Sequence, residues 1–131
     1  MIAITRINHV GLRVTDLSQT RAFYESLGFE FLVGPVGPES VAIMEHPSGV
    51  NINFILNSND AETKNVLMDV PDKHTGYTHI ALEVDNLEVV ESQLNTLGYH
   101  ITEGPIVTPD GAKFLFIRDP DSNVIEFHQP A

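Results

Sequence analysis

The sequence contains no cysteine, and only 7 of its 131 residues are Lys or Arg. The absence of cysteine excludes disulfides, thiol nucleophiles and thiolate metal ligands. With 18 Asp and Glu residues the formal net charge is −11, and the few basic residues form no cluster, so we expect neither nucleic acid nor an anionic membrane surface as a partner. No apolar run is long enough to span a bilayer, and the N-terminus lacks a signal-peptide pattern, which favours a cytoplasmic protein.

The residues that are present have the composition of a globular protein and form an internal repeat. Apolar residues make up 42% of the chain, which is enough for one folded domain of ordinary size with a core of its own. Two related halves predict a pseudo-two-fold arrangement, with matched residues at equivalent positions. The repeated pairs are residues 8–14 and 78–84, Gly34-Pro35 and Gly104-Pro105, and residues 46–54 and 119–127.

Each half has the pattern of a strand, a helix and three further strands. In residues 7–14, apolar residues alternate with His9, Gly11 and Arg13, which is the period of a half-buried strand. Asp16 can cap a helix that Gly28 ends, and Asp85 or Asn86 can cap a helix that Gly98 ends. The further strands are expected at about 29–33, 41–45 and 50–56, and, after a strand at 78–84 and a helix at 87–97, near 100–103, 113–118 and 124–128.

The pattern predicts an α+β protein with two tandem β-α-β-β-β modules in a single domain, residues 1–131. Module one covers about 1–57, a polar connector about 58–77, and module two about 78–131. One helix can cover only one face of its sheet, so the other face of each sheet must line a cavity, form an interface, or do both.

Metal-ligand residue types lie on that second face at matched positions. His9 and Asn53 are expected there in the first half, and His79 and Glu126 in the second, with the small residues Gly11 and Ala81 leaving room for a ligand. Two neutral imidazoles and a carboxylate form the facial set that binds a divalent metal and leaves positions open for substrate. Asn53 is the weak member, because an amide oxygen binds metal less firmly than a carboxylate does.

Two further observations concern charge on this face. A carboxylate buried without a partner is costly, so an inward Glu126 favours a bound cation. Arg13 lies four positions after His9, and a buried Arg there needs an anion, either Glu83 or a substrate carboxylate. His128 shares the face of Glu126, where it either supports that carboxylate or is exposed.

These residues resemble the vicinal oxygen chelate superfamily, which holds glyoxalase I, extradiol dioxygenases, methylmalonyl-CoA epimerase, fosfomycin-resistance enzymes and bleomycin-binding proteins. The resemblance covers nearly the whole chain and implies a curved, open, mixed sheet of eight strands around the site. In these proteins the site can lie within one chain or between swapped modules of two, and we expect a homodimer. The resemblance to this superfamily rests on four segments, residues 9–17, 23–29, 76–86 and 119–127.

Short bacterial glyoxalase I proteins are the most similar members in length and layout. Their four metal positions correspond to His9, Asn53, His79 and Glu126, and their glutathione-binding Arg and Asn correspond to Arg13 and Asn57. The resemblance implies a metal-dependent isomerase or lyase that acts on a small substrate with vicinal oxygens, with Ni, Zn or Fe as the ion and Glu126 as the proton-transferring base. The departure is Asn53, where glyoxalase I has a metal-binding Glu.

Three alternatives to glyoxalase I stay open, the first two because of the departure at Asn53. His9, His79 and Glu126 alone match the iron(II) set of extradiol dioxygenases. Epimerases of the superfamily use an amide ligand at the position of Asn53. A non-catalytic, bleomycin-resistance type of binding protein agrees with the acidic net charge, although such proteins generally lack the metal set.

Overall fold

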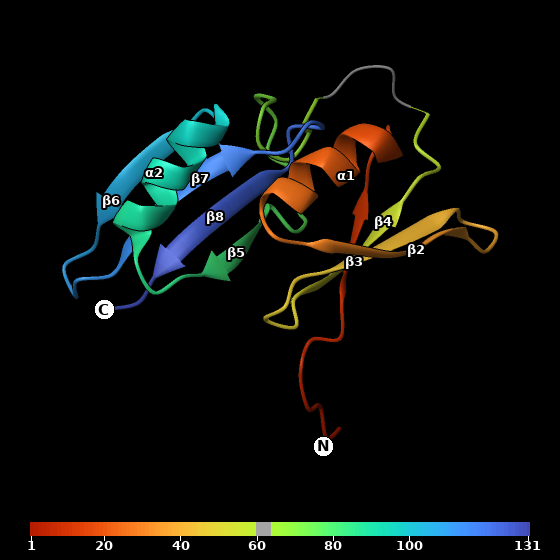
Figure 1. The fold of residues 1–131 in the computed structure, drawn as a ribbon, viewed down its shortest axis with the longest axis horizontal. Helices are drawn as coiled ribbons and strands as arrows, with labels where there is room; N and C mark the ends of the chain where they lie inside the picture. The colour runs from red at the N-terminus through yellow and green to blue at the C-terminus, as the bar shows by residue number, and fades with distance from the viewer. Residues whose placement is uncertain (60–63) are drawn as a thin grey trace. The chain divides into compact units, whose positions relative to one another are not determined.

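A computed structural model describes residues 1–59 and 64–131; part of the expected connector, residues 60–63, lies outside the described residues. The chain divides into two compact units, Met1–Glu62 and Thr63–Ala131. Both units have the element order β-α-β-β-β (Figure 1). The expected α+β class with two tandem modules is therefore confirmed.

The first unit is a four-stranded mixed sheet with one helix. The strand order is β1-β4-β3-β2; β1 and β4 are parallel, and the other neighbours are antiparallel. The connection through the helix carries the chain from β1 to the far edge of the sheet, so β4 returns beside β1. The elements are β1 (Val10–Arg13), α1 (Leu17–Ser26), β2 (Glu30–Val36), β3 (Val41–Glu45) and β4 (Asn51–Ile55).

The second unit repeats this topology with the order β5-β8-β7-β6, in which β5 and β8 are parallel. In Figure 1, α2 lies across β7 and β8. The elements are β5 (His79–Glu83), α2 (Leu87–Leu97), β6 (Glu103–Val107), β7 (Lys113–Arg118) and β8 (Val124–Gln129).

Both helices begin at the side-chain caps that the sequence indicates. Asp16 accepts a hydrogen bond from the backbone N–H of Gln19 at 2.9 Å, and Asn86 accepts one from Val89 at 3.2 Å. Asn86, and not Asp85, is therefore the cap of α2. Gly98 ends α2 with a φ of +80°, a left-handed conformation that glycine adopts without strain. The helices of the described residues are 10 and 11 residues long, and neither could cross a membrane.

Each sheet buries one face under its helix. In β4 the core residues Ile52 and Phe54 alternate with half-buried Asn51, Asn53 and Ile55, as the period-two pattern predicts. In the second unit Leu115 and Ile117 of β7 are fully buried, and so are Leu87 and Leu94 of α2. Leu97, which the helical spacing assigns to the same apolar stripe, is instead exposed at the C-terminal end of α2.

The strand boundaries differ from expectation at the two Gly-Pro pairs. The expected strands at 29–33 and 100–103 stop before these pairs, because Gly and Pro usually interrupt strands. In the structure β2 continues through its pair to Val36. β6 begins only at Glu103 and runs through its pair to Val107, so the expected strand at residues 100–102 is wrong. Both are edge strands with irregular register at this point, and an edge is where a sheet tolerates the missing N–H of proline. The first strand is also shorter than expected, because residues 7–9 lie outside β1.

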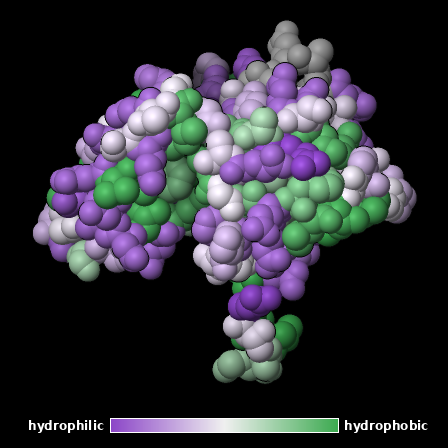
Figure 2. All heavy atoms as spheres, in the orientation of Figure 1, coloured by the Kyte–Doolittle hydropathy of each residue, from purple (hydrophilic) through white to green (hydrophobic). Residues whose placement is uncertain are grey.

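The outer edge of the first sheet carries exposed apolar residues. Figure 2 shows apolar side chains gathered over β2, and the residues concerned are Leu32, Val33 and Val36. Pro35 and the register shifts interrupt this strand, which reduces its ability to pair with the edge of another sheet.

Gly34 and Gly104 are needed because the neighbouring strand comes too close for a side chain. A Cβ at Gly34 would lie 2.5 Å from the Cα of Ala42, and one at Gly104 would lie 2.8 Å from the carbonyl oxygen of Phe114. Both residues also have positive φ, +131° and +92°. The repeat of the Gly-Pro pair thus reflects the same close strand approach in both units.

Gly104→Ala is expected to lower the free energy of unfolding by about 1–3 kcal/mol, because a positive φ and the contact with the Phe114 carbonyl both oppose a side chain. Denaturant unfolding measures this change. Gly49→Ala is the matched control, since Gly49 has a φ of +95° but nothing within 4 Å of a Cβ. An equal loss in both variants would show that strand approach does not contribute at Gly104.

Candidate functional site

The first unit places its polar residues on the sheet face opposite the core. Gly11 of β1 lies opposite Asn53 of β4, so the two strands present Asn53 and Arg13 on one face, and His9 directly precedes β1. His9 and Arg13 are exposed, and Asn53 is half-buried between Gly11 and Ile43 of the neighbouring strands.

Arg13 belongs to a hydrogen-bonded chain of three side chains. Its Nε donates to the Oδ1 of Asn57 at 3.0 Å, and the Nδ2 of Asn57 donates to a carboxylate oxygen of Glu39 at 2.5 Å. The backbone N–H of Leu56 donates to the carbonyl of Ser40, which holds the turn with Glu39 beside the end of β4. The structure therefore pairs the two residues expected to bind substrate, and adds Glu39, which the sequence did not indicate.

The second unit holds a carboxylate between two imidazoles. Glu126 of β8 is 9% exposed, and its Oε1 lies 3.2 Å from the Nε2 of His79 on the neighbouring strand β5. Its Oε2 lies 2.8 Å from the Nδ1 of His128. Because a carboxylate only accepts, His128 donates this hydrogen bond from Nδ1. His128 therefore supports Glu126, which resolves the two expectations for this residue in favour of the first.

Aromatic rings line the same face of the second sheet. Phe116 lies opposite Glu126 in β7 and packs edge-on against the ring of His79, with centroids 5.6 Å apart. Phe114 stacks on the ring of His128 at 5.9 Å. These rings restrict the orientation of both imidazoles.

Both candidate metal-binding histidines are oriented by the residue before them. The Nδ1 of His9 lies 2.8 Å from the Oδ1 of Asn8, and the Nδ1 of His79 lies 2.9 Å from the hydroxyl of Thr78. An Nδ1–H that donates to either oxygen leaves the lone pair on Nε2, which is the arrangement that metal-binding histidines use. Asn8 and Thr78 were not predicted from the sequence, although a polar residue precedes each histidine in the repeat.

The strand register makes Asn53 and Glu126 structurally equivalent. Gly11 lies opposite Asn53, and Ala81 lies opposite Glu126, each two residues after its histidine. The two halves therefore differ in charge at one matched position. An amide stands in the first unit where the second has a carboxylate.

The spacing of two donors in the second unit is compatible with a divalent metal. Two ligand atoms bound to one Zn-sized ion at about 2.0–2.1 Å lie about 3 Å apart. The 3.2 Å between the Nε2 of His79 and the Oε1 of Glu126 agrees with this spacing. Within residues 1–59 and 64–131, no group of three or more His, Cys, Asp or Glu side chains is arranged to hold a metal ion. Each unit supplies only two of the four expected ligands.

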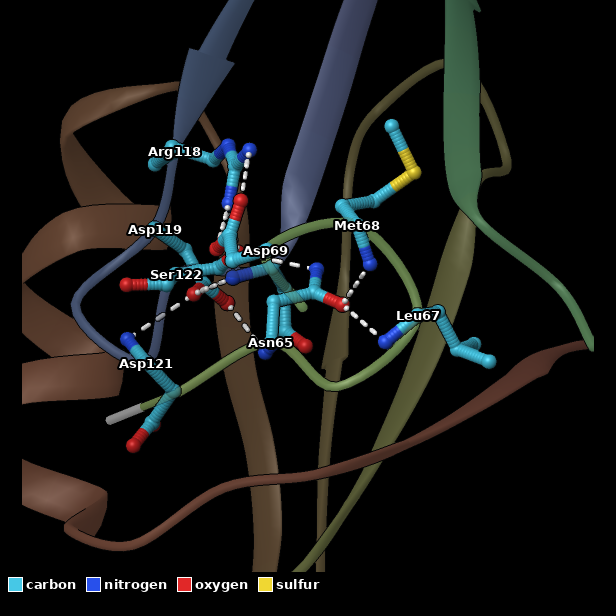
Figure 3. A network of polar contacts seen from close by, with 9 residues as sticks. Asn65, Leu67, Met68, Asp69, Arg118, Asp119, Asp121 and Ser122 are labelled. Atoms are coloured by element: carbon cyan, nitrogen blue, oxygen red, sulfur yellow. Dashed lines mark hydrogen bonds and ion pairs between the residues drawn. The ribbon is translucent and has the colours of Figure 1, made fainter. Parts of the chain in front are cut away.

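A second polar network joins the connector to the turn before β8 (Figure 3). Arg118 at the end of β7 makes a two-pronged ion pair with Asp69, with N–O distances of 2.8 and 3.0 Å, and donates to the carbonyl of Ser122. Asn65 donates to the same carbonyl at 3.1 Å. The hydrogen bond from Arg118 holds the pKa of Asp69 below its ordinary value. None of these residues was expected to matter from the sequence.

Comparison with known proteins places the chain in a family. Residues 6–127 match the model of the Glyoxalase/Bleomycin resistance protein/Dioxygenase superfamily. Mitochondrial methylmalonyl-CoA epimerase of Bos taurus is 32% identical over 129 residues, covering 88% of this chain and 68% of the epimerase. Lactoylglutathione lyase of Haemophilus influenzae is 30% identical over 128 residues, covering 93% of this chain and 90% of the lyase.

A solved structure has the same fold. The glyoxalase family protein from Enterococcus faecalis superposes with a TM-score of 0.78 at 26% identity, covering 94% of this chain and 96% of that protein. Members of this family bind small molecules and are usually metal-dependent, and both curated relatives are enzymes. The chain therefore belongs to the Glyoxalase/Bleomycin resistance protein/Dioxygenase superfamily.

Proposed function

We propose that this protein is a metal-dependent isomerase or lyase of the glyoxalase I type, acting on a small substrate with vicinal oxygens. The observation that carries this proposal is the Glu126 carboxylate, buried beside His79 at 3.2 Å and held by His128 at 2.8 Å. A carboxylate held in this way is positioned to accept a proton from carbon and to return it.

His9, His79, Glu126 and, more weakly, Asn53 would hold the ion, which is Ni, Zn or Fe by the chemistry of nitrogen and oxygen ligands. A bound divalent ion would polarise the substrate carbonyl as a Lewis acid. The matched orientation of His9 and His79 supports their role as ligands, because the Nδ1 atom of each is hydrogen-bonded to the side chain of the preceding residue.

Glu126 is the proposed catalytic base. With a hemithioacetal substrate, the proton on the carbon that carries sulfur and hydroxyl moves to the carboxylate and then to the neighbouring carbonyl carbon. The hydroxyl proton moves to the former carbonyl oxygen, so the product is a thioester with an adjacent hydroxyl group. No other reactant is consumed, which suits a site that uses one carboxylate first as base and then as acid.

Arg13 and Asn57 are proposed to bind the substrate away from the reacting carbons. Arg13 lies four residues after His9 on the same face, which is about 13 Å along an extended chain. A substrate that reaches both places is therefore elongated, with an anionic group at the Arg13 end. Glu39 accepts from the Asn57 amide, so the Oδ1 of Asn57 is turned toward Arg13.

The test is an assay of the protein stripped of metal and then loaded with Ni²⁺, Zn²⁺ or Fe²⁺. Methylglyoxal and glutathione are added, and thioester formation is followed. Turnover is expected with at least one ion and should disappear when a chelator removes it. A rate equal to the metal-free background with every ion would exclude the lyase.

An epimerase is the second candidate, and Asn53 is the observation that favours it, because the superfamily's epimerases use an amide at this position. The relatives at 32% and 33% identity named methylmalonyl-CoA epimerase agree with this alternative. Incubation with methylmalonyl-CoA in D₂O distinguishes the two, since an epimerase exchanges the α-proton for deuterium and a glyoxalase-type lyase leaves it in place. We also propose that the protein forms a homodimer and is located in the cytoplasm, whichever of the two activities it has.

A further inference from the structure

Arg118 lies on the same sheet face as His79, and both residues are aligned with Val124 of the strand between them. In β7 the buried Leu115 and Ile117 point to the core, so Arg118 points to the opposite face. Arg118 is paired with Val124 of β8, and Val124 is paired with His79 of β5. Neighbouring strands lie about 4.8 Å apart, so the backbones of Arg118 and His79 are about 10 Å apart across one intervening strand.

Arg118 holds a short connector segment, residues 65–69, which we name the strap. Its guanidinium makes the two-pronged pair with Asp69 at one end of the strap, while Asn65 at the other end donates to the Ser122 carbonyl that Arg118 also contacts (Figure 3). Asn65 also accepts hydrogen bonds from the backbone N–H groups of Leu67 and Met68 at 3.0 and 3.1 Å. The strap is therefore a closed turn, fixed at both ends.

The strap contacts the segment that leads into His79. The side chain of Leu67 lies against Gly76, where an added Cβ would be 3.1 Å from its Cδ1. Gly76 has a φ of +151° and precedes His79 by three residues. A continuous set of contacts thus runs from Arg118 through Asp69 and Leu67 to the entry of β5.

His79 needs such support because of its place in the sheet. It is the first residue of β5, and within the part of the chain that the structure describes β5 is an edge strand that pairs with β8 alone. Its side chain is 36% exposed, and Tyr77, two residues earlier, is fully exposed. A residue at the open end of an edge strand has few contacts to fix its backbone, whereas a metal ligand must be held closely to its binding geometry.

We propose that Arg118 and Asp69 are positioning residues for His79: the ion pair fixes the strap, and the strap fixes the backbone from which the His79 imidazole reaches the metal. This inference rests on the proposed function in taking His79 as a metal ligand. Disruption of a supporting contact of this kind typically weakens metal binding by about 10–100-fold.

The test compares Asp69→Asn and Arg118→Met with the wild-type chain by titration calorimetry with Ni²⁺. We expect about 10–100-fold weaker binding in both variants and little change in melting temperature, because a partly exposed ion pair contributes little to stability. Glu25→Gln is the control, since it breaks the exposed ion pair with Arg21 in α1. Binding within about threefold of wild type in both test variants would overturn the proposal.

A double-mutant cycle separates positioning from a general structural role. In a His79→Ala background, Asp69→Asn is expected to weaken Ni²⁺ binding no further, because the ligand that it positions is gone. A loss of the same size in both backgrounds would mean that the strap does not act through His79, and would also overturn the proposal.

The imidazole NMR signals of His79 in metal-free protein give a readout that needs neither metal nor activity. We expect them to move in Asp69→Asn and to stay in place in Glu25→Gln. If wild-type protein binds no divalent ion, the proposed function fails, and these signals alone decide the inference: unmoved His79 signals would overturn it.

Discussion

Glu126→Gln is expected to lower kcat by about 10²–10⁴-fold, the range that a positioned general base contributes. Glutamine has the size of glutamate and can still accept from the Nδ1–H of His128, so the change removes the charge and the basic oxygen with little loss of packing. Steady-state kinetics with the best substrate and ion of the assay above measure this effect. Because Glu126 is also an expected ligand, kcat is compared at saturating metal, where weaker binding of the ion no longer limits the rate.

Glu103→Gln is the control for this substitution. Glu103 lies in β6 of the same sheet but is exposed at its far edge. We expect its kcat to stay within about twofold of wild type, since exposed surface changes away from a site have small effects. A Glu126→Gln protein that keeps most of its kcat at saturating metal would show that the proton is transferred by another group, and the proposed role of Glu126 would be wrong.

Asn53→Glu is expected to tighten divalent-metal binding by about 10–100-fold, which is about 1.4–2.8 kcal/mol of binding free energy. The substitution restores the four-ligand set of glyoxalase I and adds a negative charge where the ion would be. The fold can accept a glutamate here, because the equivalent position in the second unit already holds Glu126 opposite the small Ala81, and Asn53 lies opposite Gly11. Competition with a chromogenic chelator measures the affinity.

The activities of Asn53→Glu should change in opposite directions. We expect a higher rate with the methylglyoxal–glutathione adduct and, if the wild type exchanges the α-proton of methylmalonyl-CoA, a lower rate of that exchange. Asn51→Glu is the matched control, because Asn51 lies two residues earlier in β4 on the same face. If both substitutions tighten metal binding equally, the gain comes from added charge in general, and Asn53 is not a ligand position.

Most of the secondary structure could be predicted because it depends on local patterns. Helix α2 begins and ends where its cap residues and apolar spacing indicate, and β7 covers the expected residues. The expected strands end too early at Gly34-Pro35 and Gly104-Pro105, where local preferences indicate turns, and residues 7–9 and 100–102 were wrongly assigned to strands. These pairs lie within strands because β2 and β6 are sheet edges, and position in a sheet is not a local property.

The candidate site was only partly predictable, for a similar reason. Alternation along β4 and β8 identifies the residues that share the face opposite the core, including Asn53 and Glu126. It does not identify Glu39, Arg118 or Asp69, since each meets its partner through a turn or connector far away in the sequence. Such contacts depend on how loops pack, which no periodicity encodes.

The sequence by itself determined the repeat, the two-module fold and the residue types at the matched positions, because a strand of period two assigns each side chain to one face. Only the tertiary structure decided how those side chains are held: the Glu126 carboxylate between two imidazoles, the orientation of each histidine by its predecessor, and the strap that Arg118 fixes at the entry of β5. The physical reason is that hydrogen bonds and ion pairs need their atoms within about 3 Å, and only the folded chain brings distant residues that close.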